Sequence, residues 1–270
     1  MKIIVTGGSG FIGSHLLDCL LEDGHEITVL DNLSTGRLDN INHIKNDVRF
    51  INCDLVNING WANECDDIDV IFHLAALADI VPSIENPNKY FDANVNGTFN
   101  ILSLAKEKKV KKFIYAASSS CYGLAKEFPT KETNDIDLQY PYALTKRLGE
   151  ELVLHWGRLY NINVTSMRFF NVYGPRSRTS GTYGAVFGVF LAQLLAKSPF
   201  TIVGDGNQTR DFTYVTDIAN AMKCSMKSNK SGQIYNVGSG ETISVNRIAD
   251  LIGGVDYKRT YIPKRPGEPD

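Results

Sequence analysis

The sequence has almost no net charge. Its 28 Lys and Arg residues stand against 30 Asp and Glu residues, which leaves a formal charge of −2 at pH 7. A chain balanced in this way has no broad basic surface, so nucleic acid and anionic membranes are not expected as partners. Any phosphate group that it binds must be held by local devices, such as a helix N-terminus or a single arginine.

Cysteine and extended apolar stretches are also scarce. The five cysteines are scattered, without C-x-x-C spacing, which favours free thiols over disulfides or a metal site. They are Cys19, Cys53, Cys65, Cys121 and Cys224. No apolar run approaches the roughly 20 residues that cross a bilayer, and the first strand leaves no room for a secretion signal before it. We therefore expect a cytoplasmic protein with no membrane span and no metal.

Strands and helices alternate along most of the chain. Apolar runs typical of buried strands are separated by segments with helical spacing. The expected strands are 2–5, 26–30, 48–51, 70–74, 112–116 and 164–170, and the clearest helices are 14–22, 94–106 and 142–160. Such alternation predicts an α/β fold with a doubly wound, parallel, Rossmann-type sheet.

The pattern changes after residue 170. Loops rich in Gly and Pro, a helix at 187–195 and a strand at 200–203 indicate a smaller α/β lobe that covers a substrate. A late strand at 233–237 is expected to return to the main sheet. The expected division is a dinucleotide-binding domain over 1–170, with its sheet completed by roughly 209–237, and an interleaved substrate-binding lobe over 171–208 and 238–270.

A glycine-rich turn joins the first strand to the first helix. It reads Gly7-Gly8-Ser9-Gly10-Phe11-Ile12-Gly13. Glycine permits a tight turn and the close approach of a pyrophosphate, and the helix N-terminus offers N–H groups to the anion.

An acidic residue follows the second strand. There, the carboxylate of Asp31 can accept hydrogen bonds from the adenosine ribose and repel a 2′-phosphate, which predicts NAD rather than NADP. Asp31 and Asn32 would also suit a simple turn. Asp54, with Leu55 beside it, follows the third strand and is a weaker candidate for an adenine contact, or a helix cap.

Tyr142 and Lys146 lie four residues apart, on one face of a predicted helix. An ammonium near a phenol favours phenolate and lowers the tyrosine pKa from about 10, so the pair can supply a general base. On its own, a tyrosine and a lysine at this spacing occur on many helices that have no catalytic role. Here Ser118, Ser119 and Ser120 end a strand upstream, where a hydroxyl can meet a substrate.

With these features together, the sequence resembles the extended short-chain dehydrogenase/reductases, the NAD-dependent epimerase/dehydratase family, and within it the UDP-galactose 4-epimerase group. The matching segments run through nearly the whole chain: 6–13, 73–76, 94–98, 116–123, Tyr142 with Lys146, 168–176, 204–217 and 265–268. They are highly specific for the superfamily and less specific for the substrate.

The resemblance implies a role for each matching residue. Tyr142 is implied as the base that takes a sugar hydroxyl proton, Lys146 as the group that lowers its pKa and binds the nicotinamide ribose, and Ser118 as a partner of the same sugar oxygen. Residues implied near the cofactor are Phe72, Ala75, Ala76, Asn94 and Phe170. Residues implied near the nucleotide-sugar are Ser119, Ser120, Asn171, Val186, Thr201, Val203, Arg210 and Arg265.

The implied reaction is epimerisation at C4 of UDP-glucose or of the N-acetylhexosamine pair, through a 4-keto intermediate. Nucleotide-sugar 4,6-dehydratases carry Asp-Glu at the positions of Ser119 and Ser120, and the decarboxylases keep a glutamate at the position of Ser120, so the serines favour an epimerase. Two other interpretations stay open, a plain alcohol dehydrogenase and a non-catalytic NAD sensor. The arginines disfavour the first, and the intact Tyr142 and Lys146 disfavour the second.

The resemblance also bears on assembly. Relatives often form homodimers through two helices of each subunit, here 94–106 and 142–160. They also continue for several dozen residues beyond Asp270, so we expect a lobe that lacks part of the wall around the sugar. The choice between UDP-glucose and UDP-N-acetylglucosamine is therefore open, as is the activity of the 270-residue form.

Overall fold

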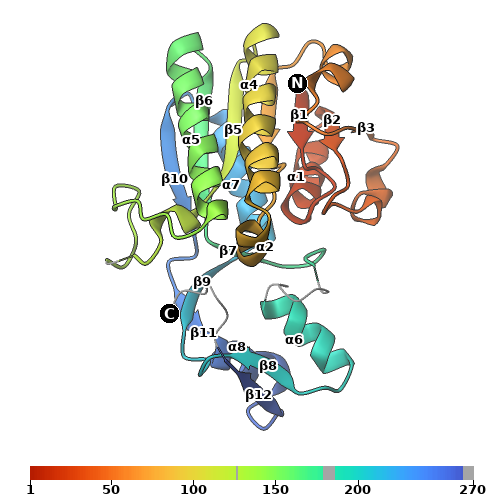
Figure 1. The fold of residues 1–270 in the computed structure, drawn as a ribbon. Helices are drawn as coiled ribbons and strands as arrows, with labels where there is room; N and C mark the ends of the chain where they lie inside the picture. Colours follow the sequence, from red (N-terminus) through yellow and green to blue (C-terminus); the bar gives the residue numbers. More distant parts are fainter. Residues whose placement is uncertain (126, 179–185, 264–270) are drawn as a thin grey trace.

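The computed structural model describes residues 1–125, 127–178 and 186–263. Seven parallel strands form the central sheet, in the order β10-β6-β5-β4-β1-β2-β3 (Figure 1). They are β1 (Lys2–Thr6), β2 (Glu26–Asp31), β3 (Val48–Asn52), β4 (Val70–His73), β5 (Lys112–Ser118), β6 (Asn163–Phe169) and β10 (Gln233–Val237). The doubly wound parallel sheet expected from the sequence is confirmed.

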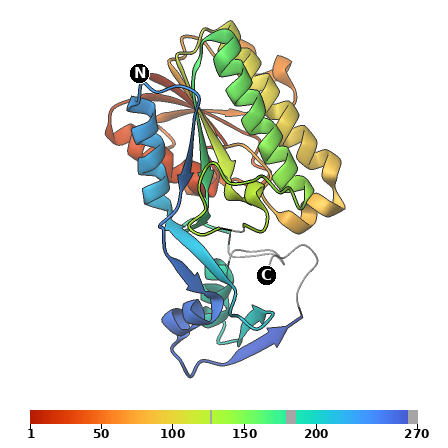
Figure 2. The same ribbon diagram turned by 90° about the vertical axis from the view of Figure 1, so that its left-hand side faces the viewer.

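Helices cover both faces of this sheet (Figure 2). They are α1 (Phe11–Glu22) and α7 (Val215–Lys227) on one face, and α4 (Gly97–Glu107) and α5 (Pro141–Tyr160) on the other. Side chains alternate along each strand, so Ile3 and Val5 of β1 join the cluster under α1 and α7, whereas Ile4 joins the cluster under α4 and α5. Both faces are therefore apolar, as in other parallel sheets.

The segment before α4 is more complex than the single helix expected from residue 94. Two short helices, α2 (Ile80–Glu85) and α3 (Pro87–Phe91), lead into a π-helical turn at Asp92–Asn96, and α4 follows. The side chain of Asn94, on this turn, is buried. Such π-helical turns are frequent at functional sites.

A smaller lobe lies beyond the carboxyl ends of the sheet strands (Figure 1). Its strands and helices are β7 (Asn171–Tyr173), β9 (Thr209–Tyr214) and β11 (Thr242–Ser244) in one sheet, β8 (Phe200–Val203) and β12 (Arg259–Ile262) in another, with α6 (Val186–Leu195) and α8 (Val245–Gly253). Phe190, Phe200 and Ile248 form the centre of its core. Within 209–237, β10 joins the main sheet, α7 covers it, and β9 belongs to the lobe.

The strand order places the site. It reverses direction between β1 and β4, and open parallel sheets bind ligands at such a switch point, outside the carboxyl ends of the strands. The lobe faces this same edge, so a ligand there would lie between the two parts of the chain.

Candidate active site

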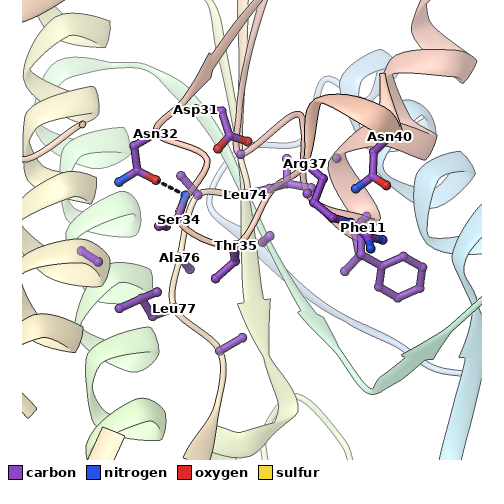
Figure 3. Close-up of a pocket in the computed structure, with 18 of the residues that line it drawn as sticks. Phe11, Asp31, Asn32, Ser34, Thr35, Arg37, Asn40, Leu74, Ala76 and Leu77 are labelled. Atoms are coloured by element: carbon purple, nitrogen blue, oxygen red, sulfur yellow. Dashed lines mark hydrogen bonds between the residues drawn. The ribbon is translucent and has the colours of Figure 1, made fainter. Parts of the chain in front are cut away.

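A pocket of about 440 Å³ opens at the carboxyl ends of β1, β2, β4 and β5 (Figure 3). It contains most of the residues that the sequence assigned to a cofactor. These are Gly7, Gly10, Phe11, Ile12, Gly13, Asp31, Asn32, Asp54, Leu55, Ala75 and Ala76. Residues from separate segments of the chain therefore meet around one cavity at the switch point.

The glycine turn forms one wall of the pocket. Gly7 has φ +68°, a conformation that side chains disfavour, and a Cβ there would lie 2.8 Å from the backbone nitrogen of Ala75. Gly10 precedes the first turn of α1, and no side chain of the described residues caps this helix end. The free N–H groups and the helix dipole make the turn suitable for an anion.

Asp31 is held rigidly at the end of β2. Its Oδ2 accepts a hydrogen bond from the Ser9 backbone N–H at 2.9 Å, and its Oδ1 accepts one from the Leu33 N–H at 2.8 Å. Burial raises the pKa of the carboxyl group, and the two backbone hydrogen bonds lower it. Because each carboxylate oxygen can accept a second hydrogen bond, Asp31 can still bind ribose hydroxyls in the pocket.

Five of the residues assigned to the cofactor do not line this pocket. They are Phe72, Asn94, Tyr142, Lys146 and Phe170. Phe72 lies away from the pocket, because the pleat of β4 turns its side chain into the fully buried core under α1 and α7. Asn94 supports the pocket wall from behind. Its Oδ1 accepts a hydrogen bond from the N–H of Leu77 at 2.8 Å, and its Nδ2 donates one to the C=O of Leu77 at 3.0 Å.

Two groups of pocket residues were not predicted from the sequence. Ser34, Thr35 and Arg37 lie in the loop directly after Asp31 (Figure 3), and their position beside that carboxylate was a usable signal. Arg178 comes from the loop after β7 and forms an ion pair with Asp79 at 2.6 Å. This pair joins segments 99 residues apart, so no local pattern could have predicted it.

Ser118 and Tyr142 form a hydrogen-bonded pair beside this pocket. Ser118 ends β5, two residues after Ala116, which lines the pocket, so both lie on one face of the strand. Tyr142 is in the first turn of α5, where its backbone N–H donates to Ser83 Oγ at 3.1 Å. Burial raises the pKa of Tyr142 to about 12, and its hydrogen bond with Ser118 acts in the opposite direction.

Lys146 lies one turn further along α5, where its ammonium contacts an aromatic ring. Lys146 Nζ lies 4.3 Å from the centre of the Tyr115 ring, in a cation–π contact. Burial lowers the pKa of Lys146 to about 7. The pKa of Tyr142 is therefore raised rather than lowered in this structure, since its burial dominates.

A buried ion pair fixes the back of α5. Glu150, one turn after Lys146, accepts hydrogen bonds from Arg168 Nη2 at 2.7 Å and Nε at 3.0 Å, and Arg147 adds a third at 2.6 Å. Arg168 also donates to the Tyr122 hydroxyl at 2.6 Å. Charge-assisted, two-point pairing of this kind restricts orientation, so the helix that carries Tyr142 and Lys146 is held against β6.

The residues assigned to a nucleotide-sugar fall into two places. Ser119 and Ser120 follow Ser118 at the end of β5, and the Ser118 and Ser120 Oγ atoms lie 3.0 Å apart. The others lie in the lobe: Asn171 on β7, Arg210 on β9, Thr201 and Val203 on β8, and Val186 at the start of α6. Arg265 lies outside the described residues.

His73 and Cys121 lie near the site, but both are buried in structural environments. His73 is buried, with its ring nitrogens 2.7 Å from Thr6 Oγ1 and 2.8 Å from Thr98 Oγ1, and burial lowers its pKa to about 3. It is a neutral core histidine held between two hydroxyls. Burial raises the pKa of the Cys121 thiol to about 11, which suits packing rather than acid catalysis.

The described residues include no helix that is both long and apolar enough to cross a membrane. They contain no group of three or more His, Cys, Asp or Glu side chains placed to hold a metal ion.

Comparison with known proteins identifies the family. The model of the NAD dependent epimerase/dehydratase family matches residues 3–238. The chain belongs to this family.

Individual relatives in the epimerase/dehydratase family carry out different reactions. The chain is 39% identical to a putative UDP-glucose 4-epimerase of Methanocaldococcus jannaschii, over 98% of this chain and 87% of that protein. It is also 33% identical to a UDP-N-acetyl-alpha-D-glucosaminuronate decarboxylase of Bacillus cytotoxicus, over 99% and 84%. Membership therefore establishes a nucleotide-sugar enzyme family but leaves the reaction to be decided.

A solved relative carries the cofactor. The structure of the Thermus thermophilus UDP-glucose 4-epimerase in complex with NAD superimposes with a TM-score of 0.90 at 32% identity, over 99% of this chain and 88% of that one. NAD is the cofactor of the epimerase/dehydratase family. The pocket fits it, because the turn at Gly7 leaves no space for a side chain beside the helix N-terminus and Asp31 is fixed at the end of β2.

Proposed function

We propose that this chain epimerises C4 of a nucleotide-sugar, UDP-glucose or its N-acetylated counterpart, with retained NAD. The observation that carries the proposal is the Ser118–Tyr142 pair, which lies at the carboxyl edge of the sheet beside the dinucleotide pocket. An oxidation of a sugar hydroxyl needs a base at the oxygen and an acceptor at the carbon. This site can offer both on one side of the substrate.

The chain's own residues would handle the proton. NAD, when bound, would supply the hydride acceptor and donor at the sugar carbon. Tyr142 would take the proton of the C4 hydroxyl as phenolate, and Ser118 would hydrogen-bond the same oxygen. The ammonium of Lys146, one helical turn away, would favour the phenolate once a ligand displaces water from the site.

The lobe would hold the rest of the substrate. We assign the diphosphate to Asn171 and Arg210, and the base to the surface formed by Val186, Thr201 and Val203. A guanidinium can make two parallel hydrogen bonds to a phosphate. A chain with almost no net charge must bind phosphates through such individual arginines.

The absence of acidic side chains at Ser119 and Ser120 favours epimerisation over dehydration or decarboxylation. Those reactions break a further bond at the sugar and require an additional acid or base. Neither serine can supply one at neutral pH.

A homodimer is also proposed. Helices α4 and α5 lie side by side on the outer face of the sheet (Figure 2), and each leaves apolar side chains exposed. The ring of Phe99 on α4 packs edge-on against Trp156 on α5, with their centres 5.4 Å apart, and is itself 45% exposed. A second copy of this pair would complete a four-helix bundle around these side chains.

Proton NMR of the sugar anomeric region tests the reaction directly. Purified protein is incubated with UDP-glucose and, separately, with UDP-N-acetylglucosamine, and no cofactor is added. We expect new galacto-configured signals with the wild-type protein. With Tyr142→Phe we expect no such signals, although NAD remains bound. Unchanged sugars in the presence of bound NAD, or a deoxy-keto product, would overturn the proposal.

A further inference from the structure

A second tyrosine, Tyr140, stands beside the proposed base. The proline at residue 141 begins α5, and it restricts the residue before it to extended backbone. Tyr140 accordingly has φ −155° and ψ 162°, and its C=O accepts the first helical hydrogen bond, from Leu144, at 3.1 Å. The position of the Tyr140 ring is therefore set by the same helix end that positions Tyr142.

The two phenol rings lie parallel. Their centres are 6.5 Å apart, and their planes differ by 2°. The Tyr140 ring is thus a direct neighbour of the Tyr142 ring. A substrate atom held at Tyr142 would have the ring of Tyr140 as its next neighbour on this side of the site.

A continuous row of hydroxyls connects these rings. Tyr142 hydrogen-bonds to Ser118, Ser118 Oγ lies 3.0 Å from Ser120 Oγ, and Ser120 hydrogen-bonds to Tyr140. The row runs from the reacting pair along the end of β5. Hydroxyls both donate and accept, so each member can exchange its internal bond for one to a sugar hydroxyl.

The far end of the row approaches the lobe. The guanidinium of Arg210, on β9, is close enough to lower the pKa of Tyr140, although burial has the larger, opposite effect. Arg210 is among the main influences on the pKa of Tyr140 and not among those on Tyr142, which indicates that Tyr140 is the nearer of the two tyrosines to the arginine assigned to the diphosphate. In a nucleotide-sugar, the group between the reacting carbon and the diphosphate is the sugar ring itself.

We propose that Tyr140 is a substrate-positioning residue that binds the sugar ring between the Ser118–Tyr142 pair and Arg210. This inference rests on the proposed function for the class of substrate. Its phenol would hydrogen-bond a sugar hydroxyl, with Ser120 as the supporting partner, and its ring face would cover the apolar C–H side of the sugar. A contact of this kind discriminates a nucleotide-sugar from the bare nucleotide.

Titration calorimetry with UDP, UDP-glucose and UDP-N-acetylglucosamine tests this assignment. Tyr140→Phe should weaken the binding of the preferred nucleotide-sugar about tenfold, as loss of a hydrogen bond in a closed site predicts, and raise its KM similarly. The Kd for UDP and the amount of retained NAD should stay close to those of the wild type. Ser120→Ala should show the same selectivity, and Tyr160→Phe, at the other end of α5, should change nothing.

The outcomes separate the two proposals. Equal weakening of UDP and the nucleotide-sugar, or no change in either, would overturn the role of Tyr140. A wild-type protein that binds no nucleotide-sugar more tightly than UDP would overturn it as well. If the wild-type protein bound a nucleotide-sugar selectively but never epimerised it, the proposed reaction would be overturned. The binding selectivity of Tyr140→Phe would still decide whether Tyr140 positions the sugar.

Discussion

The phenol of Tyr142 hydrogen-bonds to the hydroxyl of Ser118 at the carboxyl end of β5. This bond lowers the pKa of the phenol against the larger effect of burial, which raises it to about 12. The serine thus has two effects on the proposed base: it orients the phenol, and it increases the fraction that is ionised at a given pH.

Ser118→Ala should therefore affect both rate and pH dependence. We expect kcat to fall by about 10²-fold, within the range for a positioned acid–base partner. Loss of the hydrogen bond raises the pKa of Tyr142, so the limb of kcat/KM that rises with pH should move to higher pH. Steady-state kinetics at several pH values measures both effects. Ser103→Ala, which removes an exposed hydroxyl hydrogen bond to the Phe99 C=O on α4, is the control; an unmoved pH limb would show that Ser118 does not tune the base.

The sequence predicted most of the sheet because buried parallel strands and their connecting helices have strong periodic patterns. The strands at 26–30 and 233–237 and the helix at 142–160 agree with β2, β10 and α5 within a residue or two. The small sheet of β7, β9 and β11 was not foreseen. Its strands have three to six residues and come from three distant segments, so their pairing depends on tertiary contacts.

The candidate site shows the same division. The glycine turn and Asp31 are local motifs, and the structure brings both to one pocket. The direction in which side chains point was harder to predict from the sequence. Phe72 turns into the core and Lys146 turns to the ring of Tyr115, because strand pleat and core packing decide those directions.

Alanine substitutions at two glycines can distinguish the effect of backbone strain from the effect of a side chain that disturbs the cofactor turn. Gly7→Ala and Gly24→Ala both force a side chain into the left-handed region, at φ +68° and +72°, which costs about 1 kcal/mol each. A Cβ at Gly7 would also lie 2.8 Å from the Ala75 nitrogen, whereas one at Gly24 would meet nothing within 4 Å. We expect Gly7→Ala to lose most of its bound NAD and Gly24→Ala to keep it. The thermal stability of Gly7→Ala should fall by more than that of Gly24→Ala.

Chromatography of the nucleotide released on denaturation measures the NAD, and thermal melting measures stability. If the two variants retained equal NAD, the close contact at Gly7 would have no part in binding the cofactor.

His73 should make the fold acid-sensitive. Its pKa is lowered from 6.5 to about 3, so between these values the unfolded chain binds a proton that the folded chain does not. Stability is therefore fully present above pH 6.5 and is lost as the pH falls, by about 2 kcal/mol at pH 5. His73→Gln removes the titrating group.

Urea denaturation of both proteins from about pH 7.5 to about pH 5 measures this effect. The difference in unfolding free energy between wild type and His73→Gln should shrink by about 2 kcal/mol over the range. His15 and His25, whose pKa values are also lowered by burial, titrate in both proteins and cancel. A difference that stays constant with pH would mean that His73 titrates normally in the folded protein.

The proposed dimer depends on exposed apolar side chains of α4 and α5. Phe99→Glu places a charge beside Trp156 on that surface, where pairing with a second copy would bury it without a partner. Leu195→Glu, at an 85% exposed position on α6, changes charge and hydrophobicity similarly but lies in the lobe. Sedimentation velocity should show a dimer for wild type and Leu195→Glu and a monomer for Phe99→Glu, because an unpaired buried carboxylate costs several kcal/mol. A Phe99→Glu protein that sediments as the wild-type dimer would place the interface elsewhere, and a monomeric wild type would show that the chain does not need a second copy.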